Sequence, residues 1–245
     1  NFDNPEYPDP YWFRAYEATT FVGLDCSDPQ TTCFCTSLLS GPIDTSCLDV
    51  LLVEAVDAYL ARIITKKGQA LMEKPGLTAA ADPAEADAEL AKRRQAAEDR
   101  IRSSVETGGL HAQDTVALFN TPFWEEVAFA CINCGTCTYV CPTCWCFDIQ
   151  DEVHDEAGVR MRNWDSCMFP LFTLHGSGHN PRDQKSQRVR QRFMHKFKYY
   201  LDKYDSGVAC VGCGRCVRSC PVNIDIRRVA SLMNSFDPET CTCPA

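Results

Sequence analysis

The distribution of apolar and polar residues predicts two kinds of structure in the first part of the chain. Residues 49–64 are dense in β-branched and other apolar side chains, with a polar break at Val56-Asp57. An amphipathic helix would also suit this segment, but the β-branched content and the break favour a hairpin of short strands. Residues 1–45 are rich in Pro, Asp, Thr and Cys, which predicts loop with one short strand near residues 21–24.

Helices are predicted in the rest of the chain. A long polar helix starts after Asp82, a suitable N-cap that is followed by Pro83, and stops at Gly108-Gly109. Apolar side chains three and four residues apart predict another helix, packed along one face, over residues 182–203. This apolar stripe consists of Val189, Phe193, Phe197 and Tyr200. Further helices are expected from Thr121-Pro122 onward and over residues 226–234.

Composition narrows the class of protein. The 245 residues are 45% hydrophobic and 23% charged, which is ordinary for a globular fold. No apolar run approaches the ~18 residues of a membrane-spanning helix. A net charge of −9 argues against a nucleic-acid binder. The unusual feature is 17 cysteines, an odd number with many gaps of two or three residues. That spacing is typical of metal ligation in a reducing compartment, so we expect a cytoplasmic protein.

Two stretches of the chain repeat the cysteine spacing C-x2-C-x2-C-x3-C-P. The first run extends from Cys131 to Pro142, and the second run extends from Cys210 to Pro221. In iron–sulfur proteins with this spacing, three thiolates hold one cubane cluster and the fourth ligates the cluster of the other run. We therefore predict one 4Fe-4S cluster on Cys131, Cys134, Cys137 and Cys220, and a second on Cys210, Cys213, Cys216 and Cys141.

The residues around both runs suit a cluster better than they suit zinc. Gly135, Gly212 and Gly214 allow the backbone to curl close, so that N–H groups reach the sulfurs. Zinc sites also use paired C-x2-C motifs, and a zinc-stabilised assembly scaffold is therefore an alternative. Four cysteines in one tight run, twice, each run ending in Pro, fit that alternative poorly.

Nine cysteines lie outside the runs. Cys26, Cys33 and Cys35 would support a third cluster with one further thiolate, or else are small buried apolar side chains. A disulfide between Cys144 and Cys146 would be strained, so we expect these residues to pack rather than to act as a redox dithiol. Cys241 and Cys243 are expected in a free tail. The sequence assigns no role to Cys47 or Cys167.

Histidines and basic residues give weaker signals. His175 and His179 lie in a Gly-containing loop without accompanying carboxylates, so we expect loop hydrogen bonds rather than a metal site. In the predicted helix over 182–203, Arg188, Arg192 and Lys196 share one face. That face would offset the negative clusters and dock a partner subunit, although a solvated surface would explain it equally well.

Longer motifs connect the chain to a known family. The 68 residues between Cys141 and Cys210, with helical flanks, resemble the α-helical ferredoxin type of succinate dehydrogenase and heterodisulfide reductase subunits. The longer sequence motifs resemble those of the dicluster β subunits of sulfhydrogenases and NADP-linked nickel–iron hydrogenases. The A subunit of anaerobic sulfite reductase and the subunits beside heterodisulfide reductases are similar. The resemblance rests on CPTCWCFDIQDEV at 141–153, R-x-R-x-W-D-S-C at 160–167, GHNPR at 178–182, RQRFMHKFKYY at 190–200 and VGLDCSDPQTTCFCTSLLSGP at 22–42.

The resemblance implies a non-catalytic electron relay. Its partners would be a flavin subunit that uses NAD(P) and a nickel–iron hydrogenase, or alternatively a heterodisulfide reductase or sulfite reductase module. The sequence contains no nucleophile paired with a base, no P-loop and no dinucleotide-binding motif, so no motif indicates catalysis. A substrate site built on the additional cysteines would instead make the chain an enzyme subunit. The family's N-terminal portion is expected to be missing here.

The expected fold is α+β, an N-terminal loop and hairpin region followed by an α-helical ferredoxin domain with two 4Fe-4S clusters. The predicted divisions are residues 1–81, a helical connector over 82–120, the dicluster domain over 121–235 and a tail over 236–245.

Overall fold

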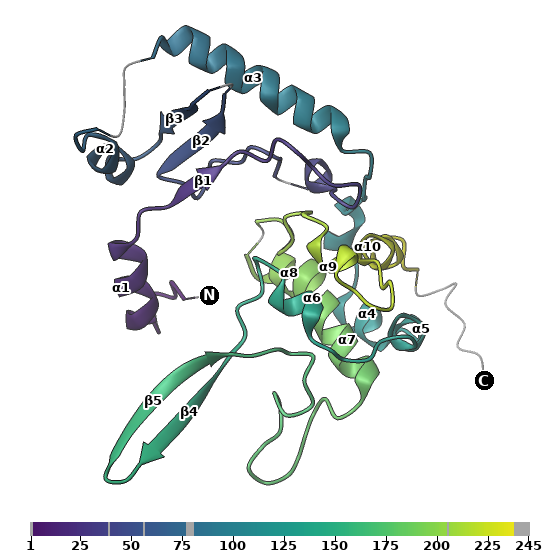
Figure 1. Ribbon diagram of the computed structural model, residues 1–245. Coiled ribbons are helices and arrows are strands. Elements are labelled where there is room, and N and C mark those ends of the chain that lie inside the picture. The colour runs from purple at the N-terminus through teal and green to yellow at the C-terminus, as the bar shows by residue number, and fades with distance from the viewer. Residues whose placement is uncertain (1, 39, 56, 77–80, 205, 238–245) are drawn as a thin grey trace. The chain divides into compact units, whose positions relative to one another are not determined.

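The computed structural model describes residues 2–38, 40–55, 57–76, 81–204 and 206–237. These residues belong to two compact units, shown in Figure 1. The first unit comprises residues 1–29 and 42–100, and the second comprises residues 30–41 and 101–245. The division at Arg100 falls inside the predicted connector, and residues 30–41 belong with the cysteine-rich part rather than with their sequence neighbours. Cys241 and Cys243 lie outside the described residues.

A small sheet forms the centre of the first unit. Strand β1 pairs in parallel with β2, and β2 pairs antiparallel with β3, which confirms both the predicted strand near 21–24 and the predicted hairpin. Ile43, Leu51, Val53 and Leu90 make the buried core between the sheet and α3. The elements are α1 Pro10–Ala18, β1 Val22–Leu24, β2 Val50–Glu54, β3 Tyr59–Ile63, α2 Lys66–Met72 and α3 Pro83–Arg100.

Helices α1 and α3 of this unit differ from the sequence-based prediction, and α2 was not predicted. Helix α1 lies where loop was expected, and it starts because the Asp9 carboxylate accepts hydrogen bonds from the N–H groups of Tyr11 and Trp12. Helix α3 begins after Asp82 as predicted but ends at Arg100, before the Gly108 stop. The following residues leave the helix because Val105 is buried in the core of the second unit, where its N–H donates to Ser37 Oγ.

The second unit consists of short helices around one long helix, with a separate hairpin. The predicted helix over 226–234 is confirmed, and the predicted helix from residue 122 corresponds to α5. Among the described residues, no helix has both the length and the apolar composition to cross a membrane. The elements are η1 Cys35–Ser37, η2 Gly108–His111, α4 Thr115–Asn120, α5 Phe123–Ala128, α6 Thr136–Tyr139, β4 Phe147–His154, β5 Ala157–Trp164, α7 Lys185–Met194, the π-helical turn η3 His195–Tyr199, α8 Tyr200–Tyr204, α9 Arg215–Arg218 and α10 Ile226–Asn234.

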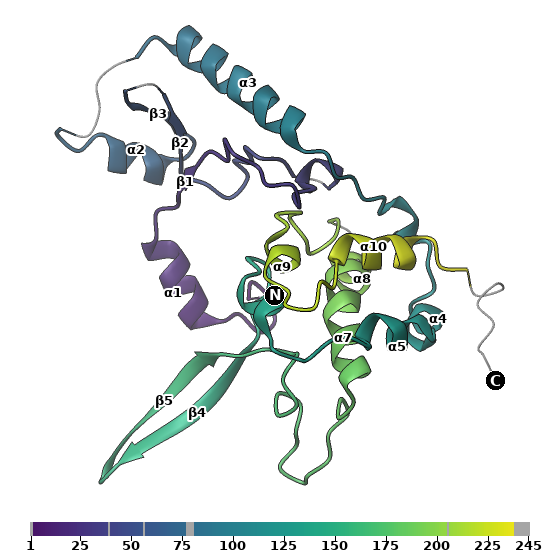
Figure 2. The same cartoon turned by 45° about the vertical axis from the view of Figure 1, so that its right-hand side comes forward.

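The core of the second unit is organised by α7, as Figure 2 shows. Val189, Phe193 and Phe197 of the predicted stripe are at most 3% exposed. The rings of Phe193 and Trp124 stack with centroids 6.4 Å apart, and the Trp124 indole N–H donates to the Leu118 carbonyl at 2.8 Å. Burial of this wide face holds α7 at the centre of the unit, next to both cysteine runs.

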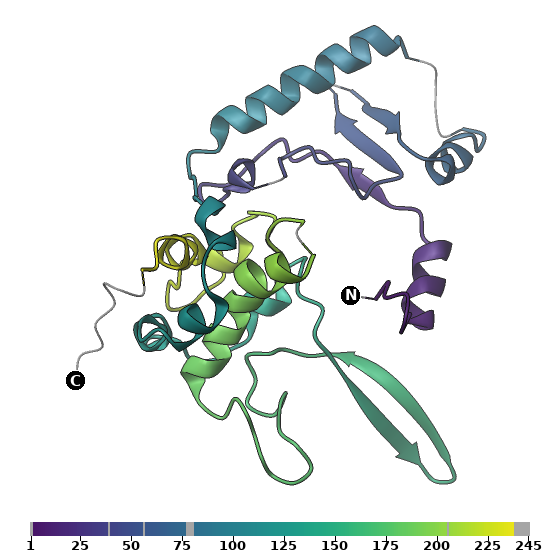
Figure 3. The ribbon, with the colours of Figure 1, turned by 180° about the vertical axis from the view of Figure 1, so that it is seen from behind.

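The hairpin β4–β5 was not predicted from the sequence. Its strands pair from Phe147 opposite Trp164 to His154 opposite Ala157, and it projects from the helices in Figure 3. Most of its side chains are exposed on both faces. Phe147, Ile149 and Val153 of β4 do alternate with polar residues, as in a half-buried strand, but neither face of the hairpin is buried in a core.

Candidate metal centre

Two cavities in the second unit are lined by cysteine side chains. Cys216 borders both of them. The structure brings Cys220 of the second run to the first cavity and Cys141 of the first run to the second cavity. The first cavity is lined by Cys131, Cys134, Cys137, Cys216 and Cys220, and the second by Cys141, Cys210, Cys213 and Cys216. Each predicted set of four cysteines therefore surrounds one cavity.

Both cysteine runs fold in the same way at their centres. Gly135 precedes α6 with φ +74°, and Gly214 precedes α9 with φ +65°. This left-handed conformation is open to glycine and strained for most other residues. Each short helix carries the third cysteine of its run, Cys137 or Cys216, toward the inside of the unit.

Backbone N–H groups point at the first cysteine of each run. Asn133, with φ +54°, donates its N–H to Cys131 Sγ at 3.4 Å. Gly212, with φ +63°, donates in the same way to Cys210 Sγ at 3.5 Å. Such bonds favour the thiolate, the form in which cysteine binds a metal.

A loop from elsewhere in the unit packs behind each run. Behind the second run, the Phe34 N–H donates to the Gly212 carbonyl at 2.8 Å, and Phe34 lines the second cavity. Behind the first run, Asn133 Nδ2 donates to the Met168 carbonyl at 2.9 Å, and Met168 lines the first cavity. The contacts are so close that a Cβ on Gly212 would lie 2.5 Å from the backbone of Cys35.

The buried thiols of the two runs need compensation if they are to ionise. Burial raises the pKa of Cys131 and Cys137, and it raises the pKa of Cys210 to about 11. A buried thiolate is costly unless a cation or metal lies beside it. The chain supplies part of that compensation from helix α7 and its continuation.

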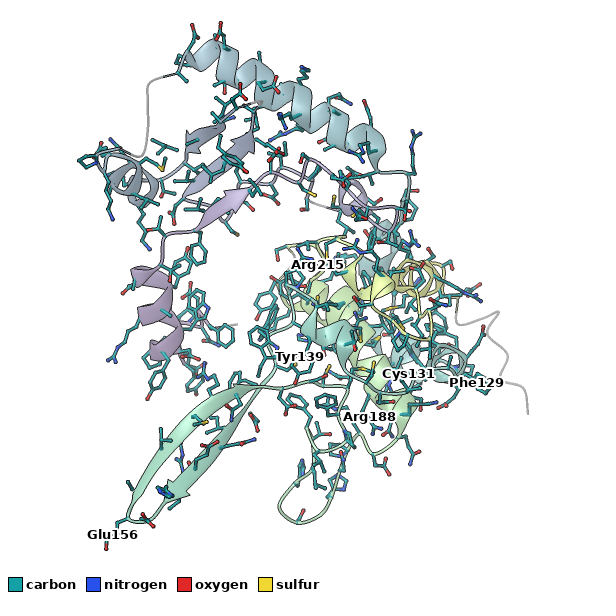
Figure 4. All side chains as sticks on the ribbon, in the orientation of Figure 1. Phe129, Cys131, Tyr139, Glu156, Arg188 and Arg215 are labelled. Atoms are coloured by element: carbon teal, nitrogen blue, oxygen red, sulfur yellow. The ribbon has the colours of Figure 1, made fainter. Side chains whose placement is uncertain are left out.

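We predicted that Arg188, Arg192 and Lys196 dock a partner subunit. That prediction is wrong, because the three side chains are only 8%, 3% and 3% exposed. Helical spacing correctly placed them on one face, but that face turns inward to the cysteine runs. The guanidinium of Arg188 donates to the carbonyls of Arg182 and Asp183, both at 2.8 Å. Figure 4 shows Arg188 and Cys131 in the helical part of this unit.

Arg192 and Lys196 each accompany one cavity. Arg192 lines the first cavity, donates to the Cys137 carbonyl at 3.2 Å and hydrogen-bonds the sulfur of Cys216. Lys196 lines the second cavity and donates to the carbonyl and hydroxyl of Thr143, both at 2.6 Å. The two groups put positive charge where negative sulfur collects.

The Arg192 guanidinium is fully buried. Burial works to lower its pKa, but the sulfurs of Cys137 and Cys216 outweigh that effect and raise it. Its Nε atom has no hydrogen-bond partner among the described residues. A buried cation with an unused donor beside a cavity lined by thiols fits an anionic group in that cavity.

The remaining cysteines take several positions. Cys144 hydrogen-bonds Cys141 and lowers the pKa of the Cys141 thiol to about 4. Cys33 and Cys35 are buried beside the second run, where Cys33 Sγ lies 3.5 Å from the Cys213 carbonyl. Cys26 is exposed and belongs to the first unit, as does the exposed Cys47. Cys146 and Cys167 hydrogen-bond each other through their side chains.

Two observations bear on metal sites of other kinds. The histidine loop is closed by the His175 backbone N–H, which donates to the His179 carbonyl at 2.8 Å. Over the described part of the chain, no three His, Cys, Asp or Glu side chains are arranged to hold a single metal ion. The thiols instead surround cavities, which is the arrangement that a polynuclear group requires.

Comparison with known proteins agrees with this geometry. Residues 130–224 match the 4Fe-4S dicluster domain family. Over 223 residues the chain is 35% identical to sulfhydrogenase 2 subunit beta of Pyrococcus furiosus. That alignment covers 89% of this chain and 64% of the relative, so the chain spans less than two thirds of the relative's length. No solved structure matches significantly.

Replacement of Gly212 tests the packing behind the second run. Gly212→Ala should lower the midpoint of thermal unfolding by about 2–10 °C, because a strained positive φ costs about 1–3 kcal/mol and the new Cβ meets the Cys35 backbone. Gly176→Ala is the matched control, since nothing lies within 4 Å of a Cβ there. Equal midpoints for the two variants, measured by circular dichroism, would contradict this account of the second run.

Proposed function

We propose that this chain, a homologue of a sulfhydrogenase β subunit with a 4Fe-4S dicluster domain at residues 130–224, is an electron-transfer subunit that relays electrons between two partner modules. The proposal is carried by one observation, the convergence of each cysteine run, completed by one cysteine from the other run, on its own cavity. The dicluster domain implies two 4Fe-4S clusters, and cubane clusters supply one-electron transfer when bound.

The proposed ligands follow the division of cysteines between the cavities. Cys216 borders both cavities, and Arg192 contacts both Cys137 and Cys216, so protein atoms connect the two sites directly. The first cluster is assigned to Cys131, Cys134, Cys137 and Cys220, and the second to Cys141, Cys210, Cys213 and Cys216.

The first run offers an approach for a partner module. Cys134 is exposed, and its neighbours Ile132 and Phe129 are 63% and 84% exposed. Figure 4 shows Phe129 beside Cys131 at the edge of the helical region. Exposed apolar residues at a redox site are typical of surfaces where electron-transfer partners meet. We place one partner contact here.

The similarity to a sulfhydrogenase subunit supports a nickel–iron hydrogenase as one partner and a flavin subunit that uses NAD(P) as the other, in the cytoplasm. A heterodisulfide reductase or sulfite reductase module is the alternative. Two tight runs of four cysteines, each ending in Pro, fit a zinc scaffold poorly. A third cluster on Cys26, Cys33 and Cys35 stays a prediction, since Cys26 belongs to a different unit from the other two.

Metal content distinguishes these possibilities. Anaerobically purified chain should contain about eight irons and eight acid-labile sulfides, and reduction should give the EPR spectrum of two interacting clusters. About twelve irons would support the third cluster and leave the relay intact. Stoichiometric zinc without iron would overturn the proposed function.

The exchange of cysteines between runs predicts which cluster a mutation damages. Cys220→Ser should weaken the cluster on Cys131, Cys134 and Cys137, because Cys220 lines that cavity. EPR of the reduced variant should lose the signal of that cluster first, as identified by parallel Cys134→Ser spectra. The exposed Cys47→Ser variant is the control. Loss of the same signal as in Cys213→Ser would contradict the exchange.

The buried guanidinium predicts a shift in reduction potential. Arg192→Gln should lower the midpoint potential of the first cluster, because one positive charge beside the sulfurs is lost. The free energy of one-electron reduction should become less favourable by on the order of 1–2 kcal/mol. Arg192→Lys should restore most of the shift, and Arg160→Gln, on the exposed hairpin, should leave it unchanged. These potentials are measured by EPR-monitored redox titration. Equal potentials in the parent and Arg192→Gln chains, at full iron content, would refute the electrostatic role.

A further inference from the structure

The hairpin β4–β5 brings two cysteines together at its base. Phe147 and Trp164 are the last paired residues, and the Asp165 N–H continues the pairing by donating to the Cys146 carbonyl at 3.0 Å. Cys146 therefore precedes one strand, and Cys167 follows the other by three residues. Residues 21 positions apart in the chain become neighbours because of the strand register.

The two side chains contact each other directly. Cys146 and Cys167 are hydrogen-bonded thiol to thiol. The Cys167 thiol lowers the pKa of Cys146 to about 6, and the same contact raises the pKa of Cys167. Cys146 is half-buried, whereas Cys167 is 8% exposed. One thiol can thus be reached from solvent while its partner is protected.

Packing fixes both ends of the pair. Trp145 packs against the rings of His195 and Tyr200, with centroids 5.9 Å and 6.4 Å away. On the other side, the buried Ser166 hydroxyl is hydrogen-bonded to Thr138 at 2.7 Å. Because the residues before Cys146 and Cys167 are both held, the thiols stay next to each other.

The pair also lies beside both proposed cluster sites. Met168, which follows Cys167, lines the first cavity. Cys144, two residues before Cys146, hydrogen-bonds Cys141 of the second cavity. Neither Cys146 nor Cys167 lines a cavity, so both thiols are free of the proposed ligand sets. The described residues offer them no third ligand for a metal ion.

We propose that Cys146 and Cys167 form a redox-active thiol pair that exchanges two electrons with external disulfides and, one at a time, with the adjacent clusters. This inference rests on the proposed relay function as its electron source. From the sequence, a disulfide was considered between Cys144 and Cys146. The strand register instead makes Cys167 the partner of Cys146.

The proposed chemistry balances as follows. The Cys146 thiolate attacks one sulfur of a disulfide RSSR, forming a mixed disulfide and releasing RS⁻, which takes up a proton. The Cys167 thiol loses its proton, attacks Cys146 Sγ and releases the second RS⁻, leaving a Cys146–Cys167 disulfide. Two electrons, one from each reduced cluster, and two protons from water restore both thiols. The net reaction reduces one RSSR to two RSH.

The first experiment maps the disulfide. Anaerobic, cluster-loaded chain is incubated with oxidised glutathione, alkylated, digested and analysed by mass spectrometry. We expect a linkage between the peptides that carry Cys146 and Cys167, its absence in Cys146→Ser and Cys167→Ser, and unchanged iron in both variants. Cys47→Ser should behave as the parent chain. Failure to form this linkage, or loss of iron from either variant, would overturn the proposal.

The second experiment tests coupling to the clusters. A reductive titration should require about four electrons per chain in the disulfide form and about two in the dithiol form. A linkage that persists after full reduction of the clusters would refute the electron exchange. If no clusters assemble, the proposed relay function fails, whereas glutathione mapping still reports on the thiol pair by itself.

Discussion

The arrangement of the second unit depends on the reciprocal exchange of one cysteine between two distant runs. Each cavity is incomplete without a residue from the other run, about 80 positions away in the chain. Everything between the runs, including α7 and the hairpin, must therefore leave Cys141 and Cys220 close to the opposite group. This constraint explains why the helices that carry Cys137 and Cys216 are single short turns, positioned by left-handed glycines rather than by their own length.

Helix α7 provides the electrostatic counterpart of that exchange. Its apolar stripe anchors it in the core, and the adjacent basic residues are then forced inward, where solvent cannot stabilise them. A buried cation needs a compensating negative charge. Thiolates that hold a cluster beside Arg192 would provide that charge, so the helix and a bound cluster would stabilise one another.

Sequence-based prediction succeeded where a feature depends on residues close together in the chain, and it failed where the feature depends on distant residues. Cysteine spacing predicted which residues gather at each cavity, and local capping predicted the first turn of α3, because those signals lie within a few residues. Periodicity showed that Arg188, Arg192 and Lys196 share a face but could not show that the face is inward. The hairpin β4–β5 was not predicted, although Phe147, Ile149 and Val153 alternate with polar residues. The meeting of Cys146 with Cys167 depended on this hairpin.

The loop that packs behind the second run has a topological consequence. Residues 30–41 lie in the chain between two segments of the first unit, yet they belong to the second unit and contact Gly212 and Gly214. The chain therefore passes between the units three times, after residues 29, 41 and 100. A nascent chain must keep this loop available until some 170 further residues have emerged. Closure of the second cavity therefore carries the entropic cost of a long-range contact, which slows folding.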